Sequence, residues 1–281
     1  MRPDTLPGPF SVAPPSVELA EDHPGFADPV YRARRDAIAR AARHHVSGHP
    51  APIVAYTDDE QATWRAVWDE LLPLHRSRVC SVLAERGEEL RLFDGPIPWI
   101  EDLNRGPLAR SGFRFEPVEG LVPADRFFAA LADGVFLSTQ FMRHSSRPLY
   151  TPEPDVVHEL VGHAASLTVP WIADLARSFG RAASRADGEL RRRIDRVFWF
   201  TMEFGVVEED GEPRAFGAGL LSSAGELARF DAEAELLPLD LERASHSEYD
   251  TDSMQRRLFV APSIDSFRAS IAAWLGRILA D

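Results

Sequence analysis

Residues 150–163 constrain this 281-residue chain more than any other stretch. These fourteen residues hold two histidines, three carboxylates and two prolines. Pro152 and Pro154 disfavour helix before about residue 154, so we expect the chain to arrive extended and then enter a helix. Glu153 and Asp155 lie where the first turn of a helix favours negative charge. The stretch therefore predicts a short extended approach followed by a mostly apolar helix.

Two histidines on that helix, His158 and His163, are five positions apart. A zinc-protease motif places its second histidine at i+4, which here is Gly162. At about 100° per residue, the two side chains would diverge by about 140° on an ideal α-helix. A shared metal ion therefore requires the helix to end or distort near Gly162, which a glycine permits. Two unrelated helix histidines remain the alternative.

A third ligand is suggested by Glu203, the single carboxylate in the aromatic and apolar run over residues 198–205. A charge in such a run is costly unless it is paired or bound to a metal. Two imidazoles and one carboxylate form the facial triad of non-haem Fe(II) oxygenases, which leaves adjacent positions for other ligands. A structural carboxylate paired with another side chain is the alternative for Glu203.

The composition excludes several classes of partner. The formal net charge is −13, no lysine is present and the arginines are scattered, which argues against nucleic acid and anionic membranes. We find no signal peptide and no apolar run long enough to span a membrane. The single cysteine, Cys80, excludes an internal disulfide, fits a reducing cytoplasm and is expected to be a buried apolar side chain.

Local patterns predict a mainly helical fold with a few short β-strands. A proline-rich, acidic arm over residues 1–22 is expected to precede one domain over residues 23–281. Pro73 predicts a bend or break, Gly87 a stop, and residues 217–225 a glycine- and serine-rich loop. Asp210 and Gly211 predict the turn of a small hairpin. Strands are expected over residues 113–118 and 135–141. One helix is expected to start at residue 57, and others are expected over residues 29–45, 97–103, 123–132, 170–185, 187–204 and 264–279.

Several longer strings then match a known family. They include HPGF at residues 23–26, DPVY at 28–31, TQ at 139–140, RH at 143–144, WFTMEFG at 199–205, GAGLLSS at 217–223 and LPL at 237–239. Together with residues 150–163, they resemble the catalytic domain of the tetrahydropterin-dependent aromatic amino acid hydroxylases. The resemblance covers about residues 23–270. It implies a single hydroxylase-type catalytic domain that uses Fe(II), a tetrahydropterin and O₂ to hydroxylate the ring of an L-aromatic amino acid.

The resemblance also implies roles for individual residues. Alone, Phe127 and Trp199 would be read as core aromatics and Arg143 as an ion-pair residue. By match to the family, the iron ligands are His158, His163 and Glu203. The substrate residues are Arg143, which would grip the substrate carboxylate, with Thr151, Asp155, Trp199, Gly219 and Ser222. The pterin residues are Gly120, Val122, Phe127 and Glu159.

The sequence departs from the family pattern at a few positions. Ala164 and Ala165 stand where the family usually has a proline two residues after the second ligand, and Phe198 replaces a common tyrosine. Neither a regulatory domain nor a long C-terminal tetramerisation helix is found, so we expect a monomer or weak dimer. Phenylalanine is the favoured substrate, with tyrosine, tryptophan or another ring position as alternatives. A zinc-dependent hydrolase and a non-catalytic amino-acid sensor are the rival classes.

Overall fold

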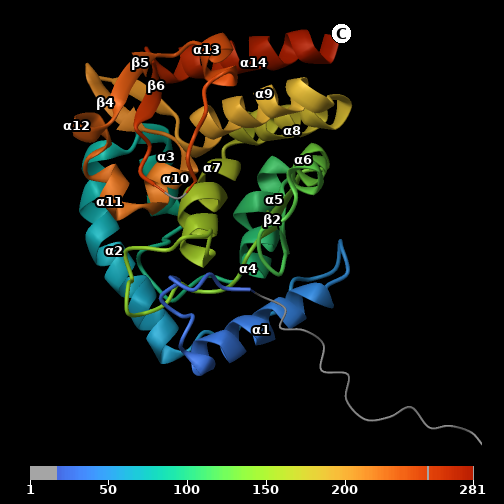
Figure 1. Ribbon diagram of the computed structural model, residues 1–281, viewed down its shortest axis with the longest axis vertical. Coiled ribbons are helices and arrows are strands. Elements are labelled where there is room, and N and C mark those ends of the chain that lie inside the picture. The colour runs from blue at the N-terminus through green and yellow to red at the C-terminus, as the bar shows by residue number, and fades with distance from the viewer. Residues whose placement is uncertain (1–17, 252, 281) are drawn as a thin grey trace, which may run out of the picture.

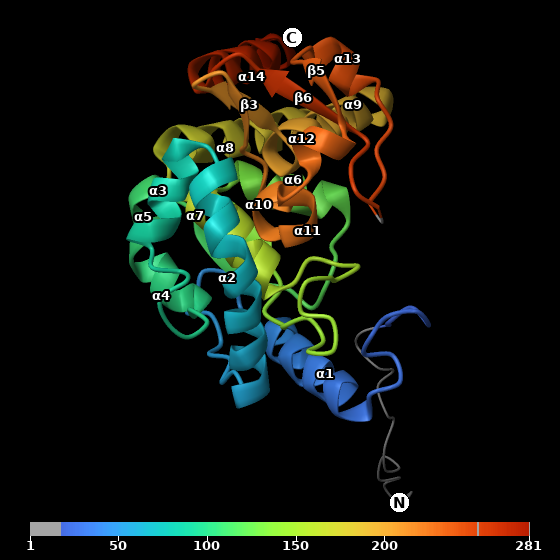
Figure 2. The ribbon, with the colours of Figure 1, turned by 90° about the vertical axis from the view of Figure 1, so that its left-hand side faces the viewer.

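Helices make up most of the computed structural model, which describes residues 18–251 and 253–280. The long helices α8 (Pro170–Arg185), α9 (Gly188–Phe198) and α14 (Ile264–Ala280) lie together at one end, and α1 (Pro29–Arg43) lies at the other (Figures 1 and 2). Helix α6 (Ala124–Ala132) packs closely on α8, and Gly180 of α8 permits this approach. A Cβ on Gly180 would lie 2.2 Å from the backbone nitrogen of Ala132. The predicted mainly helical fold is confirmed.

The N-terminal helices begin where the sequence predicts. The Asp28 side chain accepts hydrogen bonds from the backbone nitrogens of Val30 and Tyr31 and caps α1. Thr57 and Glu60 form the expected capping box of α2 (Asp58–Arg78). Most of residues 1–22 lie outside the described residues, so the flexible arm stays a prediction.

Two predicted helix breaks are wrong. Helix α2 continues through Pro73 to Arg78, and Gly87 lies inside α3 (Ser81–Glu89). In α2 the buried face includes Leu71 before the proline and His75 after it, so packing on both sides offsets the one lost backbone hydrogen bond. Cys80, at the start of α3, is fully buried as expected.

A parallel pair of strands leads into the site. β1 (Arg114–Pro117) pairs with β2 (Val135–Ser138), and the two are joined through α6. The strand expected to reach residue 141 ends at 138, where its partner also ends. Two short helices, α4 (Ile100–Arg105) and α5 (Pro107–Ser111), precede β1.

A four-stranded sheet in the order β4-β3-β6-β5 lies near α14 (Figure 2). β3 (Val206–Glu209) and β4 (Glu212–Ala215) form the predicted hairpin, with positive φ at both Asp210 and Gly211. β6 (Arg257–Ala261) lies parallel to both β3 and β5 (Glu235–Pro238). The local sequence pattern does not predict β5 or β6.

The predicted loop over residues 217–225 is wrong, because most of it is helical. It forms α10 (Ala218–Ser222) and the start of α11 (Ala224–Leu227), and every residue of α10 is buried. The remaining short helices are α7 (Ala165–Leu167), α12 (Phe230–Glu233) and α13 (Leu241–Ser245). Across the described part of the chain, no helix combines the length and hydropathy needed to cross a bilayer.

Candidate active site

The helix that carries His158 and His163 is wider than an α-helix. Residues His158–Ala164 form a π-helical segment, η1, whose i→i+5 hydrogen bonds bring every fifth residue back to nearly the same face. The two Nε2 atoms consequently lie 3.0 Å apart. The predicted distortion is confirmed, although it spans all of η1 and the helix continues into α7.

Gly162 has a different role from the one its sequence position suggests. A Cβ on this residue would lie 2.8 Å from both the Cβ and the carbonyl oxygen of Ala218. The glycine therefore lets α10 approach η1 closely, and its left-handed conformational freedom is not used.

Glu203 completes the cluster from a second π-helical segment, η2 (Trp199–Glu203), which continues α9. Its Oε1 lies 3.2 Å from Nε2 of His163 and its Oε2 lies 3.6 Å from Nε2 of His158. One ligand atom from each residue lies within 4.8 Å of the other two. Two imidazoles and one carboxylate, all largely buried, fit a ferrous ion bound on one face and leave the opposite positions open.

The His158 ring is fixed by Ser222 of α10. Nδ1 of His158 lies 3.0 Å from Oγ of Ser222, whose hydroxyl donates to the carbonyl oxygen of Ala218 at 2.8 Å. With that hydroxyl proton engaged, Nδ1–H donates to Oγ, and the Nε2 lone pair faces the metal site. Ser222, expected beside the substrate, therefore contacts a metal-binding histidine.

Burial and neighbouring charges shift the pKa values of the three cluster residues, and they oppose each other at Glu203 and His163. Burial, and then the neighbouring His163, lower the pKa of His158 to about 4. Burial raises the pKa of Glu203, but its contacts with His163 and His158 outweigh this and the pKa is lowered. Burial lowers the pKa of His163, yet the charge of Glu203 more than offsets this and the pKa is raised. A carboxylate beside imidazole nitrogens is the donor set that a cation needs.

Arg143 and Asp155 form a buried ion pair beside the metal cluster. Nε and Nη2 of Arg143 donate to the two carboxylate oxygens of Asp155 at 2.8 and 2.7 Å. Burial raises the pKa of Asp155, but Arg143 outweighs it and the pKa is lowered. Asp155 also accepts from the backbone nitrogen of His158 at 3.3 Å. The Thr151 hydroxyl donates to the carbonyl oxygen of Glu153, and the hydrogen bonds of the Arg143 side chain go to Asp155 and Pro148.

Trp199 and Gly219 are brought together through a third residue, Phe204. The Trp199 and Phe204 rings lie 4.7 Å apart, and a Cβ on Gly219 would lie 2.4 Å from the Phe204 ring. Trp199 is the first residue of η2, so this aromatic wall and Glu203 share one segment.

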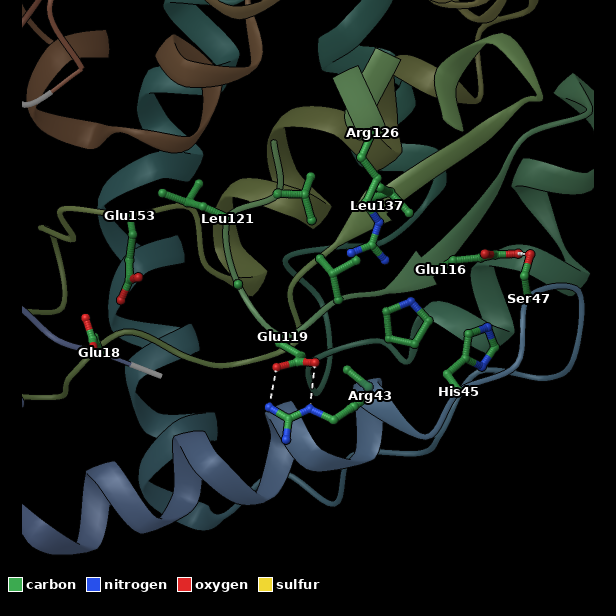
Figure 3. A pocket seen from close by; sticks show the side chains of 15 residues that line it. Glu18, Arg43, His45, Ser47, Glu116, Glu119, Leu121, Arg126, Leu137 and Glu153 are labelled. Atoms are coloured by element: carbon green, nitrogen blue, oxygen red, sulfur yellow. Dashed lines mark hydrogen bonds and ion pairs between the residues drawn. The ribbon is translucent and has the colours of Figure 1, made fainter. Parts of the chain in front are cut away.

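The predicted pterin residues fall into two groups. Gly120 and Val122 line a cavity of about 590 Å³ between the end of α1 and the β1–α6 connection. Figure 3 shows the Arg43–Glu119 ion pair and Arg126 at this cavity. None of His158, His163 and Glu203 is among the described residues that line it.

The second group lies closer to the metal cluster. Phe127 packs on Phe136, whose ring lies 4.3 Å from that of His163. Glu159 accepts from the backbone nitrogen and the hydroxyl of Thr139, both at 2.9 Å. Burial raises the pKa of Glu159 to about 7, against the lowering effects of His163 and Thr139.

Comparison with known proteins identifies the family. A family model for biopterin-dependent aromatic amino acid hydroxylases matches residues 11–280. This chain belongs to that family. It is therefore grouped with the iron- and pterin-dependent aromatic amino acid monooxygenases, and its catalytic domain is phenylalanine hydroxylase-like.

Individual relatives agree with this assignment. The chloroplastic phenylalanine 4-monooxygenase of Chlamydomonas reinhardtii is 44% identical over 270 residues, which cover 92% of this chain and 73% of that protein. Human tyrosine 3-monooxygenase is 39% identical over 269 residues, which cover 94% of this chain and 51% of that protein. The chain thus spans about half the length of that relative.

A solved structure shares the fold and shows the family's cofactors. Chromobacterium violaceum phenylalanine hydroxylase with bound iron(III) and 7,8-dihydrobiopterin superposes with a TM-score of 0.75 at 30% identity. The match covers 84% of this chain and 89% of that one. In the present chain, His158, His163 and Glu203 offer three ligand atoms that lie within 4.8 Å of one another, a donor set of the kind that binds iron.

Proposed function

We propose that this hydroxylase converts L-phenylalanine to L-tyrosine with Fe(II), a tetrahydropterin and O₂. The observation that carries the proposal is the convergence of His158, His163 and Glu203. Asp155, the partner of Arg143 in the buried ion pair, lies three residues before His158 in the chain. The 44% identity to the phenylalanine 4-monooxygenase of Chlamydomonas reinhardtii supports phenylalanine as the substrate, and Trp199, by resemblance to the family, supports phenylalanine or tyrosine over tryptophan.

Each group of residues would contribute a separate task. His158, His163 and Glu203 would hold iron, which together with the pterin supplies the chemistry of O₂ activation. Arg143 would bind the substrate carboxylate through the N–H groups of Nη1 and Nη2 that do not donate to Asp155, although Nη1 also donates to the carbonyl oxygen of Pro148 at 3.3 Å. Trp199 would form one wall for the substrate ring. Gly120, Val122, Phe127 and Glu159 would border the pterin.

One incubation tests the proposal directly. Iron-loaded protein is mixed with tetrahydrobiopterin, O₂ and each of phenylalanine, tyrosine and tryptophan, and the products are identified by mass and chromatography. We expect tyrosine from phenylalanine as the fastest product. A faster conversion of tyrosine to a catechol, or of tryptophan, would assign the same chemistry to the alternative substrate.

The same preparation separates the two rival classes. Zinc-loaded protein that hydrolyses esters or amides, with no pterin-dependent oxygen uptake from the iron form, would favour a hydrolase. Amino-acid binding without any pterin oxidation would favour a sensor. Product formation coupled to pterin oxidation excludes both.

A further inference from the structure

Trp199 is held on three sides by other side chains. Its ring stacks on that of Tyr249 with centroids 4.2 Å apart and planes 12° apart. Phe204 packs at 4.7 Å, and the indole Nε1–H donates to Oε1 of Gln255 at 3.0 Å. Tyr249 and Gln255 lie some fifty residues later in the chain, on the segment between α13 and β6. The orientation of the indole plane therefore depends on that segment.

Tyr249 is itself anchored to the helix that carries Trp199. Its hydroxyl donates to Oδ2 of Asp195 at 2.6 Å. Asp195 lies on α9 four residues before Trp199, so the two occupy the same side of the helix one turn apart. Tyr249 thus bridges them, with its hydroxyl on Asp195 and its ring on the indole. This bridge lies where α9 changes into η2, the segment that ends at Glu203.

Gln255 is also fixed in orientation. Its backbone nitrogen donates to Glu226 at 2.7 Å, and its side-chain Nε2 donates to the carbonyl oxygens of Asp250 and Ser253 at 2.7 and 3.2 Å. Because Nε2 is engaged with backbone acceptors, Oε1 is the atom that faces the indole. The amide is therefore oriented to accept the indole N–H, and rotation of the Trp199 side chain would break this hydrogen bond.

We propose that Tyr249 and Gln255 are positioning residues that fix the indole of Trp199 and thereby set where the ring of the aromatic amino acid can lie. The inference rests on the proposed function, because it takes Trp199 as a wall of the substrate pocket. A mobile indole leaves the substrate ring less constrained. The affinity for the amino acid and the fraction of pterin oxidation that yields hydroxylated product should therefore both fall. Pterin binding depends on other residues and is unaffected.

The test compares Tyr249→Leu, which removes the ring, with Tyr249→Phe, which keeps the stack and removes the hydroxyl. For Tyr249→Leu we expect the KM for phenylalanine to rise about tenfold, with coupling reduced, since a stacked aromatic pair contributes up to about that factor. In Tyr249→Leu, the KM for tetrahydropterin should stay within about twofold of the wild-type value. In Tyr249→Phe, the KM for phenylalanine should stay close to the wild-type value. Gln255→Leu should raise the same KM without removing the stack.

Glu248→Gln is the matched control on the same segment. It breaks the ion pair between Glu248 and Arg196, next to Tyr249, without touching Trp199, and should leave both KM values unchanged. Equal rises in the two KM values, or an unchanged KM for phenylalanine in both Tyr249→Leu and Gln255→Leu, would overturn the inference. Near-UV circular dichroism identifies a variant that fails to fold, in which case the other variant decides.

Failure of the proposed function is recognised separately. If the wild-type protein hydroxylates no aromatic amino acid, calorimetric Kd values for phenylalanine still report whether Tyr249→Leu and Gln255→Leu weaken amino-acid binding. A Kd that is unchanged in both variants would overturn the positioning role as well.

Discussion

A single carboxylate, that of Asp155, joins the arginine and the metal helix. Its two oxygens accept from the Arg143 guanidinium, and one also accepts from the backbone nitrogen of His158 at the start of η1. The residue is fully buried, so its charge depends on these partners. Under the proposed function, Asp155 would therefore link the residue that binds the substrate to a residue that binds the metal.

The first residue-scale prediction concerns the metal. His158→Ala and Glu203→Ala should each reduce bound iron to below about a tenth of the wild-type amount, because each removes a direct ligand whereas even outer contacts cost tenfold or more. Turnover should be lost while far-ultraviolet circular dichroism stays near wild type. His44→Ala, an exposed histidine, is the control. Retained hydroxylation by an iron-free preparation of either variant would refute the ligand assignment.

The second residue-scale prediction concerns Arg143. Arg143→Lys keeps the charge but cannot form the planar two-pronged contact with Asp155 and a substrate carboxylate together. We expect the KM for phenylalanine to rise by about tenfold or more, with the KM for the pterin little changed. Arg143→Ala should in addition lower the free energy of unfolding by about 3 kcal/mol, since it leaves Asp155 buried and unpaired. Steady-state kinetics and urea unfolding measure the two effects.

At the scale of elements, the site depends on the close packing of η1 against α10. Gly162 faces Ala218 at the contact, and Ser222 at the far end of α10 holds His158. Both π-helical segments supply metal-binding residues: η1 provides the two histidines and η2 provides Glu203. A shift of α10 would therefore disturb the orientation of His158 without changing any ligand.

Gly162→Ala tests this packing. The added Cβ would meet Ala218 at 2.8 Å, and we expect a loss of about 1–3 kcal/mol of unfolding free energy together with weaker iron binding. Gly276→Ala in α14 is the matched control, because no atom lies within 4 Å of its added Cβ, and it should be neutral or stabilising by up to about 1 kcal/mol. Unfolding curves and iron titrations compare the two. A Gly162→Ala protein as stable as Gly276→Ala would contradict the packing argument.

At the scale of the whole molecule, α2 supports the site from more than a hundred residues away in sequence. His75 of α2 is buried, and its Nε2 lies 2.7 Å from the carbonyl oxygen of Leu221 in α10. Leu221 directly precedes Ser222, the partner of His158. Burial lowers the pKa of His75 to about 4, with the Leu221 carbonyl acting in the opposite direction.

This lowered pKa predicts a loss of stability in acid. Between the ordinary value near 6.5 and about 4, the unfolded chain takes up a proton at His75 and the folded chain does not. Stability attributable to this group is therefore present above about pH 6.5 and falls as the pH drops toward 4, by about 3 kcal/mol in all. His75→Gln keeps a hydrogen-bond donor but does not titrate, so its unfolding free energy should fall less over this range. A pH dependence identical to that of wild type in urea unfolding would contradict this, and exposed His44→Gln is the control.

Several features of this protein are encoded by residues that are neighbours in the sequence. The caps at Asp28 and Thr57 and the turn at Asp210–Gly211 are local hydrogen-bond and φ preferences, so they were readable without a fold. The three residues that the structure brings together, His158, His163 and Glu203, are also predictable from the sequence, because charged and metal-binding groups are rare in apolar runs. The i+5 spacing of His158 and His163 also predicts a distorted helix, although it does not specify a π-helix.

Other features depend on contacts between residues that are far apart in the sequence. Residues 218–222 look like a glycine- and serine-rich loop but form a buried helix, because Gly162 and Gly219 admit their neighbours at close range. Pro73 did not break α2, because the buried face extends past it. The stacking of Tyr249 on Trp199 and the hydrogen bond from His158 to Ser222 join residues fifty or more positions apart, and no local pattern encodes such a pairing.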